Sequence, residues 1–501
     1  MKLALLSLIL AVFFDYLFYS KPFGISYPIY VLSFLALFYW SCSNRIAIRN
    51  PFGWFILIPA ILLSSAFFIH SNPVLHFINI FMVPVLITWY TLLVSGCSLS
   101  LAYPDMIKII ALKMVSAPLA NTFEPYKIIL QSLKKNKTDS SNQTKKKIML
   151  GLVISVPMLS IVVFLLSSAD MVFSYYLSNI FIVIPDINFP SLVSQIMLIA
   201  AVFSYTFGFL WSFNNERPIK PSGPPCKNLH PVTLITVLVM LNIVYALFSL
   251  IQFSYLYGGQ ENSLPANFSY AEYARKGFFE LVTVTIINFS IFLAAIRHTG
   301  YVSKPTENLL KVFLSLLIMF TLNMLFSAHF KMSLYEEAYG LTYLRVFVHA
   351  FILLLFLLLI VGLIKTWYNK IPMAKIYIVA TITVYTALNY VNVDKLIAKS
   401  NIQLFHKTGH IDINYLANLS YDAVPLLTVF LKQYPSTSEE SSEQVYNSLN
   451  YRKKELKQHS QYWQSFNYSK LKARKSLDSM ERNSEFRIQT SGLLKSSHQG
   501  E

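Results

Sequence analysis

Long apolar runs separated by short polar segments recur along the first 390 residues of the chain. Most runs approach the ~20 residues that a helix needs to cross a bilayer. The runs are continuously apolar and do not alternate with a period of two, so they predict helices and not the strands of a membrane barrel. We expect about eleven spans. They cover residues 3–20, 27–42, 52–68, 74–94, 148–168, 192–213, 232–255, 278–296, 309–330, 346–365 and 374–390.

Beyond the last run the composition becomes polar, and helical patterns alternate with Gly409, Pro435 and Ser-rich turns. The sequence therefore predicts an all-α fold in three parts. These are a polytopic transmembrane helical bundle over 1–391, a small extracytoplasmic helical domain over 392–481 and a disordered tail over 482–501.

Composition agrees with a membrane setting, since 55% of the residues are hydrophobic and only 13% are charged. A soluble chain could not cover that much apolar surface. The net charge of +17 lies mainly in loops between the apolar runs, a distribution that excludes a nucleic-acid face and favours contact with membrane lipids.

The distribution of Lys and Arg predicts the orientation, because basic loops stay on the cytoplasmic side. The loop that contains Lys134 to Lys147 is the most basic and should lie inside. Counting spans from it places the amino terminus in the cytoplasm and the carboxyl terminus outside. Just before it, the stretches MIKIIALKMV and YKIILQSLKK have helix-like spacing. Two readings stay open for them: interfacial helices with lysines toward headgroups, or plain helical connections.

Ionisable residues at membrane depth cost about 2.5–3.5 kcal/mol each, so they are candidate functional groups. The predicted topology brings most of them to the outer leaflet, where they could line an outward-facing polar cavity between spans one, eight, nine and ten. The candidates are Asp15, Glu272, Arg275, Glu280, His329, Glu337, Arg345 and His349.

The roles of these groups stay open between structure and function. Glu272, Lys276 and Glu280 follow one another at i, i+4 spacing, which suits either an ion-pair stripe that holds helices together or a functional charge. Glu280 and Arg345 are predicted to form one charge system, and Arg275 or Arg345 could pair with Asp15. His349 is more readily explained as a packed, hydrogen-bonded histidine.

Three asparagines lie near the middle of spans seven, eight and nine: Asn242, Asn288 and Asn323. Hydrogen bonding between helices is the favoured interpretation, and a polar path toward the cytoplasm is the alternative.

Searches for known chemistries find no Walker motif, no H-E-x-x-H helix and no G-x-S-x-G elbow. Cys42, Cys97 and Cys226 lie too far apart in sequence for a zinc motif or a disulfide framework. We expect no cofactor and no metal, and the case for an enzyme is weakened without being excluded.

Several strings resemble an uncharacterised family of bacterial multi-pass membrane proteins, known as a domain of unknown function. They are YAEYARKGFFEL, YEEAYGLTYLR, FDYLFYSKPFGISYPIY, ALNYVNVDKLIAKSNI and LANLSYDAVPLL. The resemblance implies the multi-pass architecture and the cytoplasmic (inner) membrane of a bacterium, but no substrate or catalytic residue.

Three functional hypotheses remain. The first is a non-enzymatic transport or envelope-related protein with a solute or ion path. The second is a membrane enzyme for a lipid or lipid-linked substrate, with Glu280 or Asp15 as general base. The third is a sensor or assembly factor whose carboxyl-terminal domain binds an envelope protein.

Overall fold

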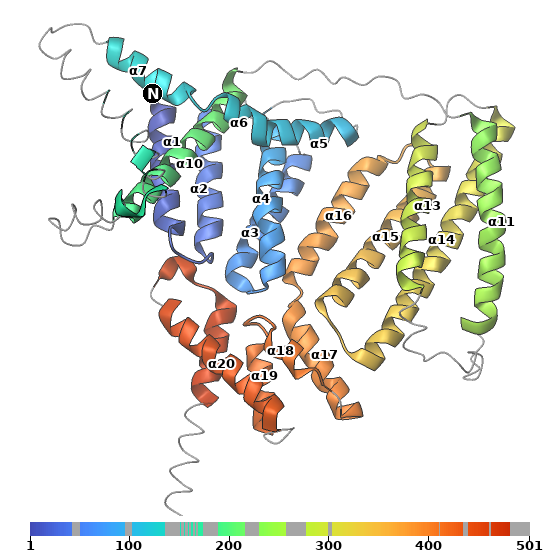
Figure 1. Ribbon diagram of the computed structural model, residues 1–501. Coiled ribbons are helices and arrows are strands. Elements are labelled where there is room, and N and C mark those ends of the chain that lie inside the picture. The colour runs from blue at the N-terminus through green and yellow to red at the C-terminus, as the bar shows by residue number, and fades with distance from the viewer. Residues whose placement is uncertain are drawn as a thin grey trace, which may run out of the picture. The chain divides into compact units, whose positions relative to one another are not determined.

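The structure is a computed structural model whose described regions are all helical in their regular elements (Figure 1). It describes residues 1–42, 51–95, 103–135, parts of 151–173, 189–215, 230–256, 277–298, 303–409, 411–433, 439–459 and 462–480. The all-α polytopic prediction is confirmed.

Seven described helices are long and apolar enough to cross a membrane, or eight if the pair Met373–Tyr390 and Val393–Thr408, bent by 62°, forms one span. Every predicted span except 148–168 coincides with a described helix, and that one falls largely outside the described residues. The first two predicted spans are helices of 17 residues each, at the short limit for crossing. The total of about eleven spans therefore stays a prediction.

The chain divides into two compact units, the first made of Met1–Pro221 with Lys454–Leu471 and the second of Ser222–Lys453 with Lys472–Glu501. The predicted boundaries at 391 and 481 stay a prediction.

The first unit is a bundle of long helices that pack side by side (Figure 1). The helices are α1 (Lys2–Phe18), α2 (Ser26–Cys42), α3 (Pro51–Ile69), α4 (Pro73–Val94) and α10 (Phe189–Asn215). Asn72 begins α4, because its side-chain oxygen accepts a hydrogen bond from the Leu75 amide at 3.0 Å and Pro73 occupies the first helical position.

Short helices cross one end of this bundle (Figure 1). They are α5 (Tyr103–Ala111), a π-helical turn (Leu112–Ser116), α6 (Ala117–Ala120) and α7 (Glu124–Lys135). Lys113 in the π-turn is buried, and its ammonium donates to the Ser212 carbonyl of α10 at 3.2 Å. The expectation that lysines of this stretch point toward headgroups is therefore wrong for Lys113, which packs against α10 instead. Lys108 of α5 is exposed, as an interfacial helix requires.

The second unit is arranged around α14 (Lys304–Tyr339), which packs against three neighbouring helices. Those neighbours are α11 (Pro231–Leu256), α13 (Phe278–His298) and α15 (Tyr343–Trp367). Helix α16 (Met373–Tyr390) packs on α15. The shared apolar core includes Leu238, Phe292, Leu317 and Leu359.

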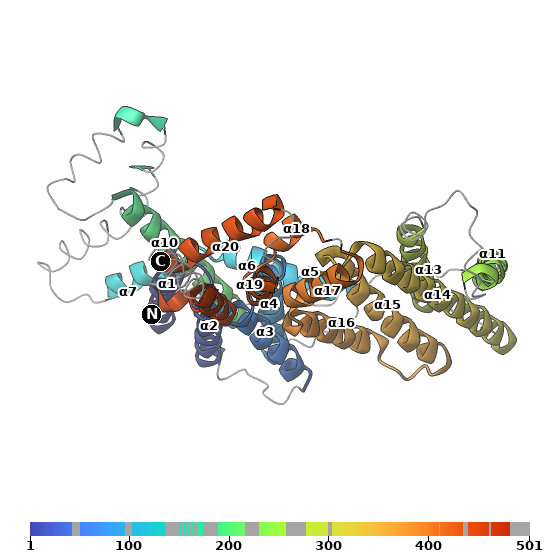
Figure 2. The same cartoon turned by 90° about the horizontal axis from the view of Figure 1, so that it is seen from below.

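Four further helices of the second unit follow α16: α17 (Val393–Thr408), α18 (Ile413–Ala417), α19 (Val424–Gln433) and the first part of α20 (Glu439–His459). Gly409 ends α17 in the left-handed conformation with φ +74°, which is the helix stop expected from the sequence. In the view from below, α17 lies beside α15 and α16 (Figure 2).

Candidate functional site

The candidate site lies at the carboxyl-terminal end of α14, where this helix is longer than a bilayer requires. Its 36 residues span about 54 Å, whereas the hydrocarbon core is about 30 Å thick. The apolar part predicted as a span ends near Phe330, so about two further turns carry polar groups beyond it.

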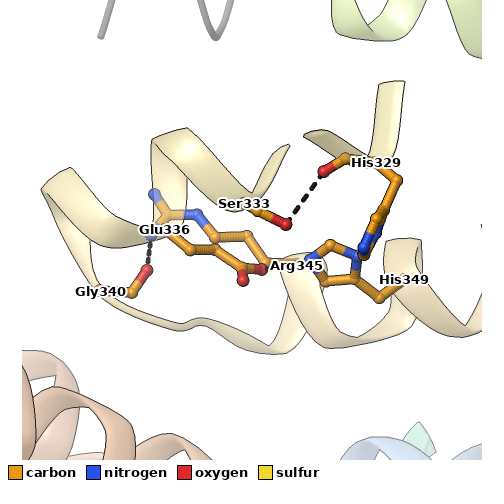
Figure 3. Close-up of polar contacts among 6 residues, drawn as sticks. All are labelled: His329, Ser333, Glu336, Gly340, Arg345 and His349. Carbon is orange, nitrogen blue, oxygen red and sulfur yellow. Dashed lines mark hydrogen bonds and ion pairs between the residues drawn. The ribbon is translucent and has the colours of Figure 1, made fainter. Parts of the chain in front are cut away.

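Two histidines face each other across the α14–α15 pair (Figure 3). The Nδ1 atoms of His329 and His349 are 3.0 Å apart, and the rings meet edge to face. Nε2 of His349 lies 2.8 Å from a carboxylate oxygen of Glu336. Glu336, His349 and His329 therefore form one hydrogen-bonded chain, in which one ring must donate and the other accept at Nδ1.

Arg345 lies beside this chain and is held by α14 (Figure 3). Its guanidinium donates to the Gly340 carbonyl and lies 4.3 Å from the centre of the Tyr335 ring. Backbone donation and cation–π contact fix the charge within the turn that joins α14 to α15.

A positively charged side chain, Lys331, lies near Glu280. Lys331 of α14 is only 7% exposed and lies within electrostatic range of Glu280, near the start of α13. Gly277, at φ +86°, leaves room for it, since a Cβ there would lie 3.2 Å from the ammonium nitrogen.

The structure brings together part of the predicted cluster. Glu280, His329, Glu337, Arg345 and His349 all lie at this end of α13, α14 and α15 in the second unit. The side chains of Glu280, His329 and Glu337 are exposed, and those of Arg345 and His349 are half-buried.

The remaining members of the cluster are placed elsewhere or not described. Asp15 belongs to the first unit, where it is half-buried and one of its carboxylate oxygens has no hydrogen-bond partner among the described residues. Glu272 and Arg275 lie outside the described residues, as does Lys276. The proposed cluster and the pairing of Glu280 with Arg345 therefore stay predictions.

Glu336 is not among the eight outer-leaflet candidates selected from the sequence. At 100° per residue, position 336 falls about 20° from His329 around the helix, whereas Glu337 falls about 80° away on the other side. Helical spacing from the histidine would have selected Glu336 from the sequence.

The turn between α14 and α15 is bonded to α17 and α18. The Tyr343 hydroxyl donates to Asp394, a carboxylate that is 1% exposed and also accepts from the Ser420 amide at 2.8 Å. The Tyr343 amide donates to the Tyr415 hydroxyl at 2.9 Å. Burial raises the pKa of Tyr415.

Asn401 of α17 completes this junction by donating to the Leu341 carbonyl at 2.8 Å. Gly340, at φ +75°, is required here because a Cβ would collide with the Asn401 side-chain oxygen. The strings LYEEAYGLTYLR, VNVDKLIAKSNI and LANLSYDAV, which carry the family resemblance, thus meet in one place.

Buried polar groups continue from this end along α14 into the apolar bundle. Asn288 of α13 accepts from the Tyr245 hydroxyl at 2.7 Å and donates to the Thr321 hydroxyl at 3.1 Å. Asn242 of α11 donates to the Phe313 carbonyl at 3.0 Å.

A second group of polar contacts lies nearer the end of α14. Asn323 donates to Ser249 and Gln252 of α11 at 3.3 and 3.4 Å, and Gln252 donates to Ser327. From Phe313 to Lys331 the polar contacts extend about 27 Å along α14, close to the thickness of the hydrocarbon core.

Within the part of the chain that the structure describes, no three His, Cys, Asp or Glu side chains are placed to hold a metal ion. The His329–His349–Glu336 chain contains side chains that can donate and accept protons.

The family model described as a domain of unknown function (DUF4153) matches residues 57–429. The chain belongs to this family. The family match contains α14, α15 and the junction with α17 and α18, but not Asp15. No curated protein and no solved structure matches the chain.

Proposed function

We propose that the protein is a membrane transport protein in which the second unit carries a small polar solute or ion along α14. The observation that supports this is the series of buried polar side chains from Asn242 to Lys331, which covers about the thickness of a bilayer. Two features within the series favour a path over simple helix association.

The first feature is a buried hydrogen-bond acceptor on α11. The side-chain oxygen of Asn242 is buried and accepts no hydrogen bond from the described residues. A buried acceptor without a donor is costly, and a water molecule or a polar solute would satisfy it.

The second is the charged end of the series. Lys331 is buried beside α13, and Glu280 reaches the same place from the first turn of that helix. A buried lysine with a neighbouring carboxylate can bind and release an ion or a proton at the mouth of a path.

We place the protein in a bacterial cytoplasmic membrane with its amino terminus inside and its carboxyl-terminal helices outside. Within each unit, carboxyl-terminal residues contact a turn between two predicted spans. Asn401 and Tyr415 contact the α14–α15 turn, and Asn467 contacts the α3–α4 turn through the Phe67 and His70 carbonyls at 2.9 and 2.6 Å. Both turns are predicted to be extracytoplasmic.

Substituted-cysteine accessibility tests the path. Asn323→Cys and Ser327→Cys would be introduced singly after Cys42, Cys97 and Cys226 are replaced by Ser. Both should react with a membrane-impermeant thiol reagent in vesicles, because water lines a polar path. Phe326→Cys is the matched control, since its side chain faces outward within the apolar part of α14 and should stay unreactive. If all three cysteines are unreactive, the polar groups only hold helices together and the proposal fails.

A further inference from the structure

A partly open apolar cavity lies in the first unit, far in sequence from the α14 series. It is formed by α1, α2, α4 and α10 and has a volume of about 470 Å³, within the range of small-molecule sites (about 300–1,000 Å³). Its lining is mostly aromatic and aliphatic and includes Phe14, Phe18, Tyr27, Phe34, Val83 and Phe209.

The aromatic walls of the cavity are fixed by packing against one another. The ring centres of Phe14 and Tyr30 are 5.1 Å apart, and those of Phe34 and Phe209 are 5.7 Å apart. Tyr27 stacks on Phe67 of α3 with ring centres 4.1 Å apart. Tilted and edge-to-face aromatic pairs hold their partners in place, so the cavity is preformed.

Three of the hydroxyl groups among the lining residues already have hydrogen-bond partners within the protein. The Tyr30 hydroxyl is hydrogen-bonded to Thr206, and the Tyr205 hydroxyl donates to the Met114 carbonyl at 3.0 Å. The cavity therefore offers an occupant mainly hydrocarbon surface, and a flexible apolar chain is the chemistry that fits it.

A basic residue lies in the turn that contributes to the cavity. Phe18 and Phe23 line the cavity on either side of the α1–α2 turn, and Lys21 lies between them in sequence. The Lys21 ammonium donates to the Tyr16 carbonyl at 2.5 Å and lies 4.7 and 5.7 Å from the centres of the Tyr16 and Tyr462 rings. It is also within electrostatic range of Asp15. Residues 19–25 of this turn contain no acidic side chain, and Lys21 has two further ammonium hydrogens besides the one bonded to Tyr16. A phosphate group beside Lys21 would share this cation with the Asp15 carboxylate.

A segment near the carboxyl terminus holds this turn in place. The Phe466 carbonyl accepts from the Ile25 amide at 3.1 Å, and a Cβ on Gly24 would lie 2.6 Å from that carbonyl oxygen. Trp463 donates to the Tyr16 hydroxyl at 3.4 Å. These contacts fix the turn at the end of the cavity before any occupant binds.

We propose that this cavity binds one hydrocarbon chain of a membrane phospholipid, with the lipid phosphate beside Lys21. The site is independent of the polar series along α14 and of the transport function proposed for it. A membrane bundle is surrounded by such chains at high local concentration, which favours a lipid over a soluble apolar ligand.

Native mass spectrometry of the full chain in detergent tests the proposal, with phosphatidylglycerol as the probe. The parent protein should retain one lipid. Ala201→Trp, which fills the cavity from α10, should reduce occupancy at least tenfold, and Ile80→Trp should do the same from α4. Val12→Trp adds the same bulk to an exposed position on α1 outside the lining and should retain the lipid.

The phosphate contact has its own control. Lys21→Gln should weaken retention of phosphatidylglycerol and leave retention of diacylglycerol, which has the same chains without phosphate, unchanged. The lipid occupancy of a Trp variant counts only if that variant elutes as a single folded species. Two cavity-filling variants on different helices are used so that the test does not depend on one of them folding. Unchanged lipid occupancy in a folded filling variant would overturn the cavity assignment. Equal loss of both lipids in Lys21→Gln would overturn the placement of the phosphate.

Discussion

The hydroxyl of Tyr343, at the start of α15, donates a hydrogen bond to the carboxylate of Asp394, at the start of α17. Because Asp394 is almost completely buried, this bond ties the α14–α15 turn to the helices that follow the membrane bundle. At this end of the second unit, α14, α15 and α17 are therefore rigidly connected. A movement of α14 or α15 would displace α17 as well.

Removing this bond should destabilise the junction. Tyr343→Phe leaves a buried carboxylate with one donor fewer, and hydrogen bonds to charged groups contribute about 1.5–3 kcal/mol. We expect a lower apparent Tm by thermal shift in detergent. Tyr339→Phe removes a hydroxyl from an exposed tyrosine four residues earlier and should leave Tm unchanged. Equal Tm values for the two variants would show that the bond contributes nothing.

Alkaline pH should weaken the same junction through Tyr415. Burial raises the pKa of Tyr415, so its neutral form is favoured in the folded state. This contribution is fully present below the ordinary tyrosine pKa of about 10 and is lost as the pH rises through the raised value. Tyr415→Phe should cost about 1 kcal/mol at neutral pH, because the Tyr343 amide loses its acceptor. Tm should also fall less between pH 9 and pH 11 in this variant than in the parent, and identical falls would contradict the assignment.

The orientation can be checked with introduced cysteines in the cysteine-free background. Ala338→Cys, beside the α14–α15 turn, and Lys475→Cys, in the carboxyl-terminal helix, should both react from outside intact cells. Ser140→Cys, in the basic loop, should react only after the membrane is permeabilised. Reaction of Ala338→Cys and Lys475→Cys from opposite sides would contradict the side shared by the tail helices and this turn. Reaction of both from the inside alone would reverse the proposed orientation.

The apolar runs predict the helices well, because each membrane-spanning helix needs about 20 consecutive apolar residues and such a run is visible in the local sequence. The end of α17 at Gly409 is also a local signal, because glycine readily adopts the left-handed conformation that ends a helix. The local sequence does not predict that Lys113 is buried, since this depends on contact with Ser212 of α10, which is 99 residues away in the sequence. Long-range partners such as Asp394 for Tyr343 are likewise set by packing that the sequence pattern does not contain.

The two charge pairings at the end of α13 and α14 can be separated by double-variant cycles. Glu280→Gln and Lys331→Met should be non-additive in Tm, because removing the Glu280 charge leaves the buried Lys331 ammonium without this neighbouring carboxylate. The same cycle with Arg345→Met in place of Lys331→Met tests the sequence-based prediction that Glu280 and Arg345 form one charge system. Additive losses of Tm in that cycle would contradict this prediction.

The last prediction separates two adjacent glutamates. Glu336 contacts His349 at 2.8 Å, whereas the side chain of Glu337 is exposed, although only Glu337 was among the sequence-based candidates. Glu336→Gln keeps the size of the side chain but removes the charge that faces the histidine pair, so it should lower stability by about 1 kcal/mol and Glu337→Gln by none. The loss should shrink in a His349→Gln background, where the imidazole that contacts Glu336 is already gone. If Glu336→Gln costs the same in both backgrounds, Glu336 and His349 do not act together and the hydrogen-bonded chain to His329 ends at the two rings.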